Sequence, residues 1–301
     1  MNNFIKSLFI FLLVGALIGE LIVRVFSLNA DIPKSYMGKD NLIKNYPNQT
    51  GNYVNGTHKW VVNKYGNFGY EPRSLDSMVT IIGDSYISNL MNPPECHQAK
   101  YLSDIVSKYN FYPSSRDGAS FIEMMERAKA LEYLHPKYQL LYVHHGDFIE
   151  SIPEIKKIPL TVQYSLNAKK ITFAKLQSSI LKDVLYNFKF FYYLYRNFLV
   201  SNKDVSSNNR DEIKKEKIDY NLIQKLIIAS KQHYNTQNII LVFSPDTDLK
   251  VVEIAHRNGF KYFLLKTNNY KSWQLPNNSH WSCYGHEEAA KQVSSELLKM
   301  K

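Results

Sequence analysis

The sequence is poor in cysteine, with only two among its 301 residues. Two cysteines allow at most one disulfide, which excludes a disulfide-stabilised scaffold. Acidic residues are also few relative to basic ones, 27 against 37, so the formal net charge is +10. The chain does not lack apolar residues, because 45% are hydrophobic and 14% aromatic, and this excludes disorder of the whole chain. Its length suits one large domain or two small ones with a sizeable core.

The excess of positive charge is concentrated in one part of the chain. Residues 155–225 contain 14 Lys/Arg and 6 Asp/Glu, which gives net +8 of the total +10. A basic balance suggests an anionic partner, but the sequence shows no recognised nucleic-acid-binding module. We therefore expect no nucleic-acid partner. The basic segment is either a solvated helical face or a surface that meets anionic lipid headgroups or an acidic glycan.

The only long apolar run lies at the N-terminus. Counting from Ser7 to Phe26 gives the length of about 20 residues that a bilayer requires, with Glu20 and Arg24 near its end. A cleavable signal peptide is the alternative, but the run lacks a clear Ala-x-Ala-like pattern of small residues. We favour an uncleaved signal anchor over residues 1–28, which places the protein in a bacterial inner membrane with a single span and the remaining chain exported. A buried soluble helix is the third option.

Four apolar, β-branched runs predict a parallel sheet. They cover residues 78–82, 139–143, 238–243 and 261–265, and helical patterns lie at 101–108, 121–134, 218–233 and 286–299. Strands that alternate with helices indicate an α/β fold, and no internal repeat is visible. We predict a linker and preamble over 29–77, with a short strand at 60–62. A domain over 78–301 follows, with a helical insertion at about 151–217.

The predicted insertion does not follow the strand-helix alternation. It contains an aromatic stretch, residues 186–198, and a polar stretch, residues 201–210. We interpret it as an inserted helical subdomain or lid with a mobile loop. The aromatic stretch is expected to pack into the core rather than to form a binding platform.

A candidate nucleophile follows the first predicted strand directly, in the triplet Gly83-Asp84-Ser85. A serine at the carboxyl end of a parallel strand is well placed for nucleophilic attack, because ligands bind at that edge of such sheets. The histidine with the best context for a base is His280, in a polar loop just before the last predicted helix. The alternative roles are a helix cap for Ser85 and a surface position for His280.

Together these segments resemble the SGNH, or GDSL-type, hydrolase superfamily. Residues 79–85 match its first block, and His280 with Gly285 and His286 match its last. The second block resembles residues 116–120, and the third falls at residues 144–147. The resemblance implies a three-layer α/β/α sandwich with a mostly parallel sheet. It assigns Ser85 as nucleophile, His280 as base, and Ser85 and Gly118 as oxyanion donors.

The sequence departs from the family pattern at two positions. Gly146 stands where the family has an Asn oxyanion donor, so its contribution is in question, and His145 or a backbone amide is a substitute. The family's histidine-orienting Asp is replaced by Asn277 or Asn278. Asp84 and Asp147 are supporting residues, and we expect a structural role for Asp147.

Two further features of the site region depend on these assignments. If the loops that carry Ser85 and His280 converge, Cys96 and Cys283 converge as well, and in an oxidising compartment they form one disulfide; two free thiols are the alternative. His144 and His145 have no third ligand at a recognised spacing. We therefore expect no metal and no cofactor.

The resemblance implies a serine esterase or O-acyltransferase. With the N-terminal anchor and the preamble at 63–69, the chain resembles membrane-anchored members of this family from envelope-polysaccharide pathways. The expected substrate is an acyl ester, foremost O-acetyl, on a cell-envelope polysaccharide. The alternatives are a weak or inactive SGNH-like glycan-binding protein and a lipid esterase.

Overall fold

The computed structural model describes residues 2–176, 186–200, 218–276 and 278–300. The chain forms two compact units. One comprises Met1–Ile32, Gly51–Lys59 and Gln177–Lys217, and the other comprises Pro33–Thr50, Trp60–Leu176 and Ile218–Lys301.

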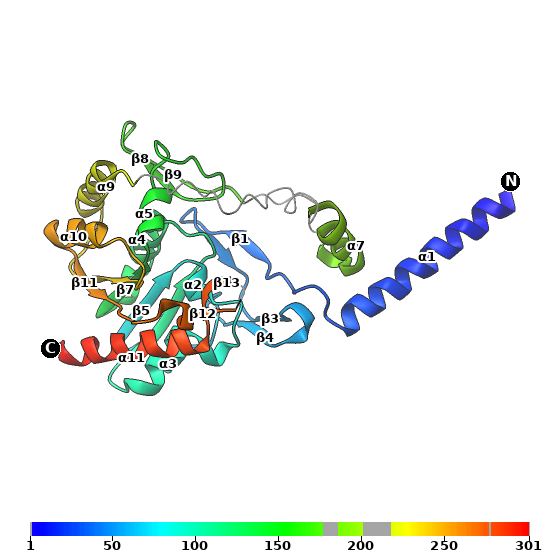
Figure 1. The fold of residues 1–301 in the computed structure, drawn as a ribbon, viewed down its shortest axis with the longest axis horizontal. Helices are drawn as coiled ribbons and strands as arrows, with labels where there is room; N and C mark the ends of the chain where they lie inside the picture. Colours follow the sequence, from blue (N-terminus) through cyan, green and yellow to red (C-terminus); the bar gives the residue numbers. More distant parts are fainter. Residues whose placement is uncertain (1, 177–185, 201–217, 277, 301) are drawn as a thin grey trace. The chain divides into compact units, whose positions relative to one another are not determined.

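The larger unit is built on a five-stranded sheet in the order β11-β10-β7-β5-β6 (Figure 1). All neighbouring strands of this sheet are parallel. The strands are β5 (Met78–Gly83), β6 (Asn110–Ser115), β7 (Tyr138–Val143), β10 (Ile239–Phe243) and β11 (Lys261–Leu264). Because β6 and β7 lie on opposite sides of β5, the chain changes direction across the sheet at this strand.

The sheet is buried on both faces, as its continuous apolar runs predict. Ile239, Leu241 and Phe243 of β10 pack into one core cluster, whereas Ile240 and Val242 pack into the other. This alternation follows from the two-residue period of a strand.

Helices cover the two faces and complete three layers (Figure 1). The first face is covered by α4 (Phe121–Ala130), α5 (His145–Glu150), α9 (Tyr220–His233) and α10 (Leu249–Arg257). The second is covered by α3 (Gln98–Ile105) and α11 (Cys283–Lys299). The predicted α/β/α sandwich with a parallel sheet is therefore confirmed.

Two elements of this unit differ from the sequence prediction. Strand β6 was not predicted because it contains Pro113, which has no N–H for a sheet ladder. The structure accommodates this proline by placing β6 at the edge of the sheet. Helix α10 was also missed, although Asp248 caps it by accepting hydrogen bonds from two backbone amides.

The remaining strands and several short helices belong to the larger unit, apart from one strand pair, residues 49–52 and 59–62, that has residues in both units. The strands form the two-stranded ladders β1–β2, β3–β4, β8–β9 and β12–β13. Their bounds are β1 (Ser35–Met37), β2 (Ile43–Asn45), β3 (Gln49–Asn52), β4 (Lys59–Val62), β8 (Gln163–Ser165), β9 (Lys170–Thr172), β12 (Gln274–Leu275) and β13 (Asn278–Trp281). The short helices are α2 (Ser85–Ser88), η2 (Pro94–Cys96), η3 (Glu132–Leu134) and η6 (Tyr270–Trp273).

The predicted insertion is divided between the two units. Its first part, through Leu176, belongs to the larger unit, where Val162, Tyr164 and Ala174 are buried in the core. Its remainder belongs to the smaller unit. The polar stretch at residues 201–210 lies outside the described residues.

The smaller unit is organised around α1 (Asn2–Val25), a 24-residue helix, with η1 (Val54–Gly56). Residues Asn3–Val25 are long and apolar enough to cross a membrane by length and composition alone. Helix α7 (Lys189–Leu194) packs against α1 and continues as a π-helical segment, η4 (Tyr195–Val200). The expectation that the aromatic stretch is core is wrong, because none of residues 186–198 is buried. This stretch belongs to the small unit, and among the described residues of that unit it packs against α1.

Candidate active site

Ser85 is the first residue of α2, directly after β5. The preceding Asp84 caps this short helix, since its Oδ1 accepts a hydrogen bond of 2.9 Å from the Tyr86 amide. The serine thus lies beyond the carboxyl end of β5, where the connections to β6 and β7 leave in opposite directions. Open parallel sheets form their ligand crevices at such a point.

His280 on β13 contacts Ser85 across 195 positions of sequence. Its Nε2 lies 2.8 Å from the Ser85 Oγ. Its Nδ1 lies 2.5 Å from the Oδ1 of Asn278, which also accepts a bond of 3.1 Å from the His280 amide. Because Asn278 Oδ1 is an acceptor, Nδ1 carries the ring proton and leaves Nε2 free to accept from the serine. Asn277, the other candidate for this role, lies outside the described residues.

Tyr86 holds the histidine strand against α2, a role that the sequence analysis did not assign. Its ring lies 4.8 Å from the His280 ring, centroid to centroid, and its hydroxyl donates a 3.0 Å hydrogen bond to the Ser279 carbonyl. Trp281 contacts the same tyrosine edge-on at 5.4 Å. The only sequence signal for Tyr86 is its position next to the candidate nucleophile.

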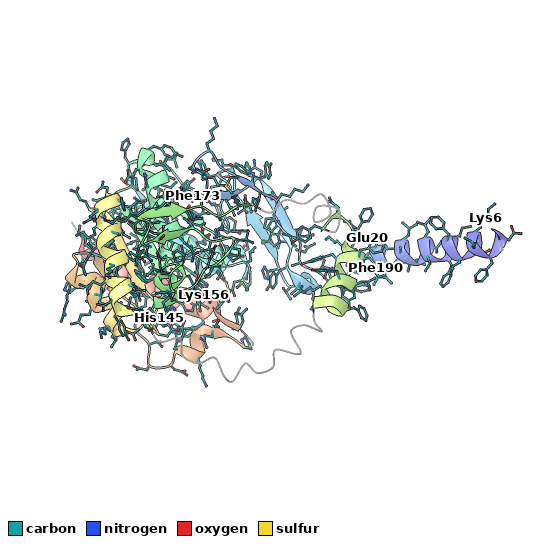
Figure 2. All side chains as sticks on the ribbon, turned by 90° about the horizontal axis from the view of Figure 1, so that it is seen from above. Lys6, Glu20, His145, Lys156, Phe173 and Phe190 are labelled. Atoms are coloured by element: carbon teal, nitrogen blue, oxygen red, sulfur yellow. A yellow bond between two sulfur atoms is a disulfide. The ribbon has the colours of Figure 1, made fainter. Side chains whose placement is uncertain are left out.

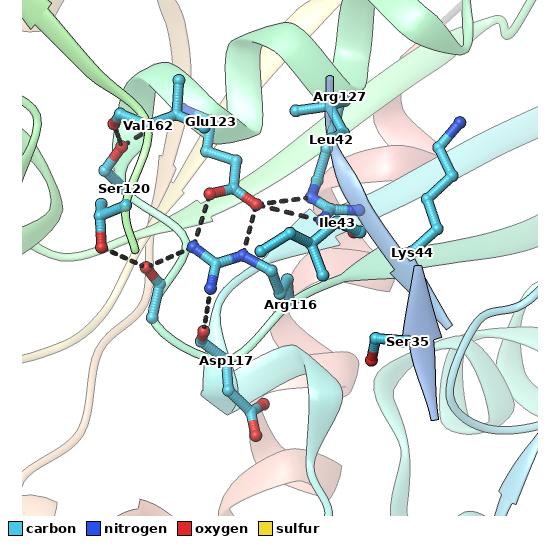
Figure 3. A network of polar contacts seen from close by, with 12 residues as sticks. Ser35, Leu42, Ile43, Lys44, Arg116, Asp117, Ser120, Glu123, Arg127 and Val162 are labelled. Atoms are coloured by element: carbon cyan, nitrogen blue, oxygen red, sulfur yellow. Dashed lines mark hydrogen bonds and ion pairs between the residues drawn. The ribbon is translucent and has the colours of Figure 1, made fainter. Parts of the chain in front are cut away.

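The candidate oxyanion loop is fixed by Arg116 (Figure 3). Its guanidinium donates to the carbonyls of Asp117 at 2.9 Å and Gly118 at 3.0 Å. With its carbonyl held in this way, Gly118 adopts a φ of +70°, and an added Cβ there would meet nothing within 4 Å. Gly118 is therefore exposed in a left-handed conformation that favours glycine.

A buried carboxylate holds Arg116 in place. Both oxygens of Glu123 accept from Arg116 at 2.6 Å, and Arg127 donates to the same carboxylate at 3.0 Å (Figure 3). Burial alone would raise the pKa of Glu123, but the hydrogen bonds and charges of the two arginines lower it overall. The sequence Ser120-Phe121-Ile122-Glu123 has the spacing of a helix-capping motif, and the Ser120 side chain does cap α4. The Glu123 carboxylate, at the end of that motif, instead binds Arg116 of the candidate oxyanion loop.

The third block does not present Gly146 as an oxyanion donor. The Gly146 amide donates to the Nδ1 of His144 at 3.2 Å, so its hydrogen is already engaged. Asp147 accepts from the His144 amide at 2.7 Å, which is the structural role expected for it. His145 accepts from the Asp248 amide and is occupied as well. Because His144 Nδ1 accepts, its Nε2 carries the proton, 3.6 Å from an oxygen of Asp246.

A small cavity of about 20 Å³ lies beside the Ser85 turn. Its lining includes Asp84, Tyr86, His144, Asp147 and Trp281. Burial raises the pKa of Asp84 to about 7, with nearby carboxylates contributing. Burial and the Asp84 charge also raise the pKa of Asp147. The hydrogen bonds that both aspartates accept from backbone amides oppose these effects.

The electrostatic environment favours a neutral His280. Burial lowers the pKa of His280 below its usual value of 6.5, and the Asp117 carboxylate offsets part of this effect. A neutral imidazole is the form that accepts a proton from a serine.

Cys96 and Cys283 form a disulfide, as predicted if the two loops converge. The bond joins the end of η2 to the first residue of α11. Asn92 adds a hydrogen bond of 2.8 Å to the carbonyl of Trp281, next to His280. The segment after Ser85 and the segment after His280 are therefore fastened together twice.

No protein-family model matches the chain, and no curated protein matches it. Among solved structures, it is similar to a putative lipolytic protein of the G-D-S-L family from Desulfitobacterium hafniense. The two are 12% identical with a TM-score of 0.39, over 73% of this chain and 99% of that one. A G-D-S-L lipolytic protein from Veillonella parvula is 10% identical with a TM-score of 0.39, over 74% and 99% of the two chains.

The chain is also similar to a family two carbohydrate esterase from Clostridium thermocellum, solved in complex with cellohexaose. That similarity has 12% identity and a TM-score of 0.38, over 77% of this chain and 67% of that one. These neighbours include members of the GDSL/SGNH group that the sequence motifs resemble. At such low values they assign no activity to this chain.

Proposed function

We propose that this protein is a serine acyl-ester hydrolase or O-acyltransferase that acts on short acyl groups, foremost O-acetyl, of a cell-envelope polysaccharide. The observation that carries the proposal is the Asn278–His280–Ser85 chain of contacts, with 2.5 Å and 2.8 Å between the bonded atoms. A serine is a weak nucleophile unless a base lies within hydrogen-bond reach, and a third group commonly orients that base. Ser85, His280 and Asn278 correspond to the nucleophile, the base and the orienting group.

In the first half-reaction Ser85 Oγ attacks the ester carbonyl carbon while His280 Nε2 accepts the hydroxyl proton. The tetrahedral intermediate collapses as His280 returns this proton to the departing sugar oxygen. The carbon–oxygen bond to the sugar breaks, and an acyl group remains on Ser85. In the second half-reaction water or another sugar hydroxyl attacks the acyl carbon and gives its proton to His280 Nε2. The bond between the acyl carbon and Ser85 Oγ then breaks, His280 returns the proton to Ser85 Oγ, and the free acid or the acylated sugar leaves.

The negative charge on the oxygen of each tetrahedral intermediate must be stabilised by hydrogen-bond donors. The Ser85 amide at the start of α2 and the exposed Gly118 amide, on the loop that Arg116 fixes, are the two that we assign. A fixed donor contributes because it does not have to reorient as charge develops. We assign no third donor, because the Nε2 proton of His144 faces Asp246 and the Nδ1 of His145 accepts from the Asp248 amide.

The choice of a short acyl group rests on the sequence resemblance, and a long-chain lipid ester is the alternative substrate. Asn278 and Gly118 are exposed, which is consistent with a polymeric alcohol that approaches from solvent.

The position of this activity depends on α1. We propose that Asn3–Val25 is a single uncleaved span that anchors the enzyme in the inner membrane, with the α/β unit outside. The length of the helix and the exposure of its apolar side chains, such as Phe11 at 72% and Leu17 at 63%, support the proposal.

The test uses the full chain in detergent micelles with p-nitrophenyl acetate and an O-acetylated polysaccharide. Wild type should release acetate from both, and Ser85→Ala and His280→Ala should not. Ser279→Ala is the matched control, because only its backbone carbonyl is used. Added acceptor sugar separates a transferase from a hydrolase. If wild type and Ser85→Ala are equally inert but both bind the polysaccharide, the protein is a glycan-binding protein and the enzymatic proposal is wrong.

A further inference from the structure

Helix α7 fits closely against α1 at one glycine. A Cβ added at Gly19 would lie 2.5 Å from the ring of Phe190, a distance that no real Cβ contact tolerates. At Gly15, one turn earlier, an added Cβ would meet nothing within 4 Å. Gly19 is therefore a position of close approach between the two helices, and its missing side chain makes room for the aromatic ring.

Polar contacts fasten the same junction. The carboxylate of Glu20 accepts hydrogen bonds from the backbone amides of Lys189 at 3.2 Å and Phe190 at 2.8 Å (Figure 2). Arg24 pairs with Glu20 at 2.6 Å and donates to the Asn187 carbonyl at 2.7 Å. Glu20 and Arg24, the charged residues that interrupt the apolar run, thus bind backbone groups at the start of α7.

The junction continues just after α1 ends. Asn29 donates to the Lys189 carbonyl at 2.9 Å, and the Lys189 ammonium pairs with Asp31 at 2.5 Å. Contacts on both sides of Lys189 fix the start of α7 at the end of the candidate span. Polar and charged groups have a high free-energy cost within a membrane unless each has a hydrogen-bonding or charged partner.

The opposite side of the α7 segment is aromatic and exposed. Phe188, Phe191, Tyr195 and Phe198 have exposed fractions of 52%, 49%, 44% and 62%. Phe191 and Tyr195 are four positions apart, which is the spacing of one α-helical side, while Phe188 directly precedes α7 and Phe198 lies in the π-helical segment. Next to them along the chain is the exposed Arg196, whose charge suits anionic headgroups. The end of α1 is likewise exposed and apolar, with Leu21 at 63% and Val25 at 66%.

We infer that residues 188–198 form a second, interfacial anchor whose aromatic side lies in the lipid headgroup region beside the end of α1. Aromatic rings are enriched at this depth of a bilayer, where one end is apolar and the other is wet. The Gly19–Phe190 contact holds this segment against α1, whose apolar side chains are also exposed. The inference rests on the proposed membrane anchoring by α1.

The test measures the depth of a tryptophan in the full chain reconstituted into vesicles of phosphatidylcholine and an anionic phospholipid. The native tryptophans Trp60, Trp273 and Trp281 are buried and give a constant background. Three variants each add one further tryptophan. They are Phe191→Trp on the aromatic side, Leu12→Trp in α1, and Tyr133→Trp on the larger unit. The exposed fraction of Tyr133 is 70%. Emission is compared between lipids brominated near the carbonyl region and near the chain ends.

We expect the added emission of Phe191→Trp to be quenched at least twofold more by shallow than by deep bromines. Leu12→Trp should be quenched by deep bromines, and Tyr133→Trp by neither. If Phe191→Trp behaves like Tyr133→Trp while Leu12→Trp is quenched, the interfacial anchor is overturned and the α1 anchor stands. Quenching of Phe191→Trp mainly by deep bromines overturns it too. If Leu12→Trp is not quenched, membrane anchoring itself fails.

A second pair of variants tests the junction. Gly19→Leu in the Phe191→Trp background should reduce the shallow quenching by at least half, because leucine displaces Phe190 and releases α7. Gly15→Leu makes the same change in composition where there is space, and should leave the quenching unchanged. Equal quenching in both variants would contradict docking through Gly19.

Discussion

The His280 ring is held by Asn278, whose Oδ1 accepts from both the ring Nδ1 at 2.5 Å and the backbone amide at 3.1 Å. The amide oxygen selects the tautomer that serves as a base, but it carries no charge to stabilise an imidazolium. The site therefore has the geometry of a serine hydrolase with a weaker electrostatic contribution at its third position.

This arrangement predicts opposite effects for two substitutions at Asn278. Asn278→Ala removes the acceptor and should lower kcat by about 10²-fold or more, the smaller end of what a positioned base contributes. Asn278→Asp keeps the acceptor and adds charge, so it should raise both kcat/KM and the pKa of His280. Hydrolysis of p-nitrophenyl acetate across pH measures both. Equal rates for wild type and Asn278→Ala would remove Asn278 from the mechanism.

The pH dependence of activity should reflect a histidine whose pKa is lowered by burial. Because His280 acts as a neutral base, the acid limb of kcat/KM should lie below pH 6.5. The Asp117 carboxylate raises this pKa, so Asp117→Asn should move the limb further down. Asp104→Asn, on an exposed ion pair of α3, is the control and should not move it. An acid limb well above 6.5 would be inconsistent with the burial of this ring.

The buried ion pairs of the oxyanion loop should be important for stability. Glu123→Ala leaves two arginines without their carboxylate and should lower the free energy of unfolding by about 3–5 kcal/mol. Arg257→Ala breaks the exposed pair with Glu253 and should cost about 0–1 kcal/mol. Arg116→Lys retains a charge but not the paired donors to Asp117 and Gly118, so it should lower kcat more than stability. Thermal unfolding and kinetics on the same preparations separate the two effects.

Stability should also depend on pH through Asp84. Its pKa is raised in the folded state, so the folded protein binds a proton that the unfolded chain releases near pH 4. The contribution is fully present below the unfolded pKa and is lost as pH rises towards about 7. Melting temperatures should accordingly fall between about pH 4 and about pH 7 from this source. Asp84→Asn keeps the helix cap and should flatten that slope, and an unchanged slope would show that another group causes it.

The disulfide should stabilise both sides of the site. Cys96→Ala combined with Cys283→Ala should lower the free energy of unfolding by about 2–5 kcal/mol, since the bond closes a loop of 187 positions. Protein isolated without reductant should take up alkylating reagent at both cysteines only after reduction. Two free thiols in such a preparation would contradict the bond.

Much of the site followed from local patterns. Buried strands are visible as apolar runs, and Gly83-Asp84-Ser85 is visible as the end of one. Which residues meet Ser85 required the resemblance, because 195 positions separate it from His280. The disulfide could then be inferred, since each cysteine lies near one of these two residues.

What could not be predicted depends on side-chain direction in three dimensions. Glu123 has the spacing of a capping residue, and only tertiary contact directs its carboxylate to Arg116 instead. His144 and His145 are adjacent in the sequence, and the orientation of α5 decides which ring faces the Ser85 cavity. The aromatic stretch has the composition of a core segment, but among the described residues it packs against α1 on one side and none of residues 186–198 is buried.

The measurement that tests the central claim most directly is mass spectrometry of the acyl-enzyme. The full chain is mixed briefly with an acetyl ester, quenched in acid and digested. The account predicts one added acetyl group on the peptide that contains Ser85, absent from Ser85→Ala and strongly reduced in His280→Ala. Ester turnover without acetyl on Ser85, or the same modification in Ser85→Ala, would contradict it.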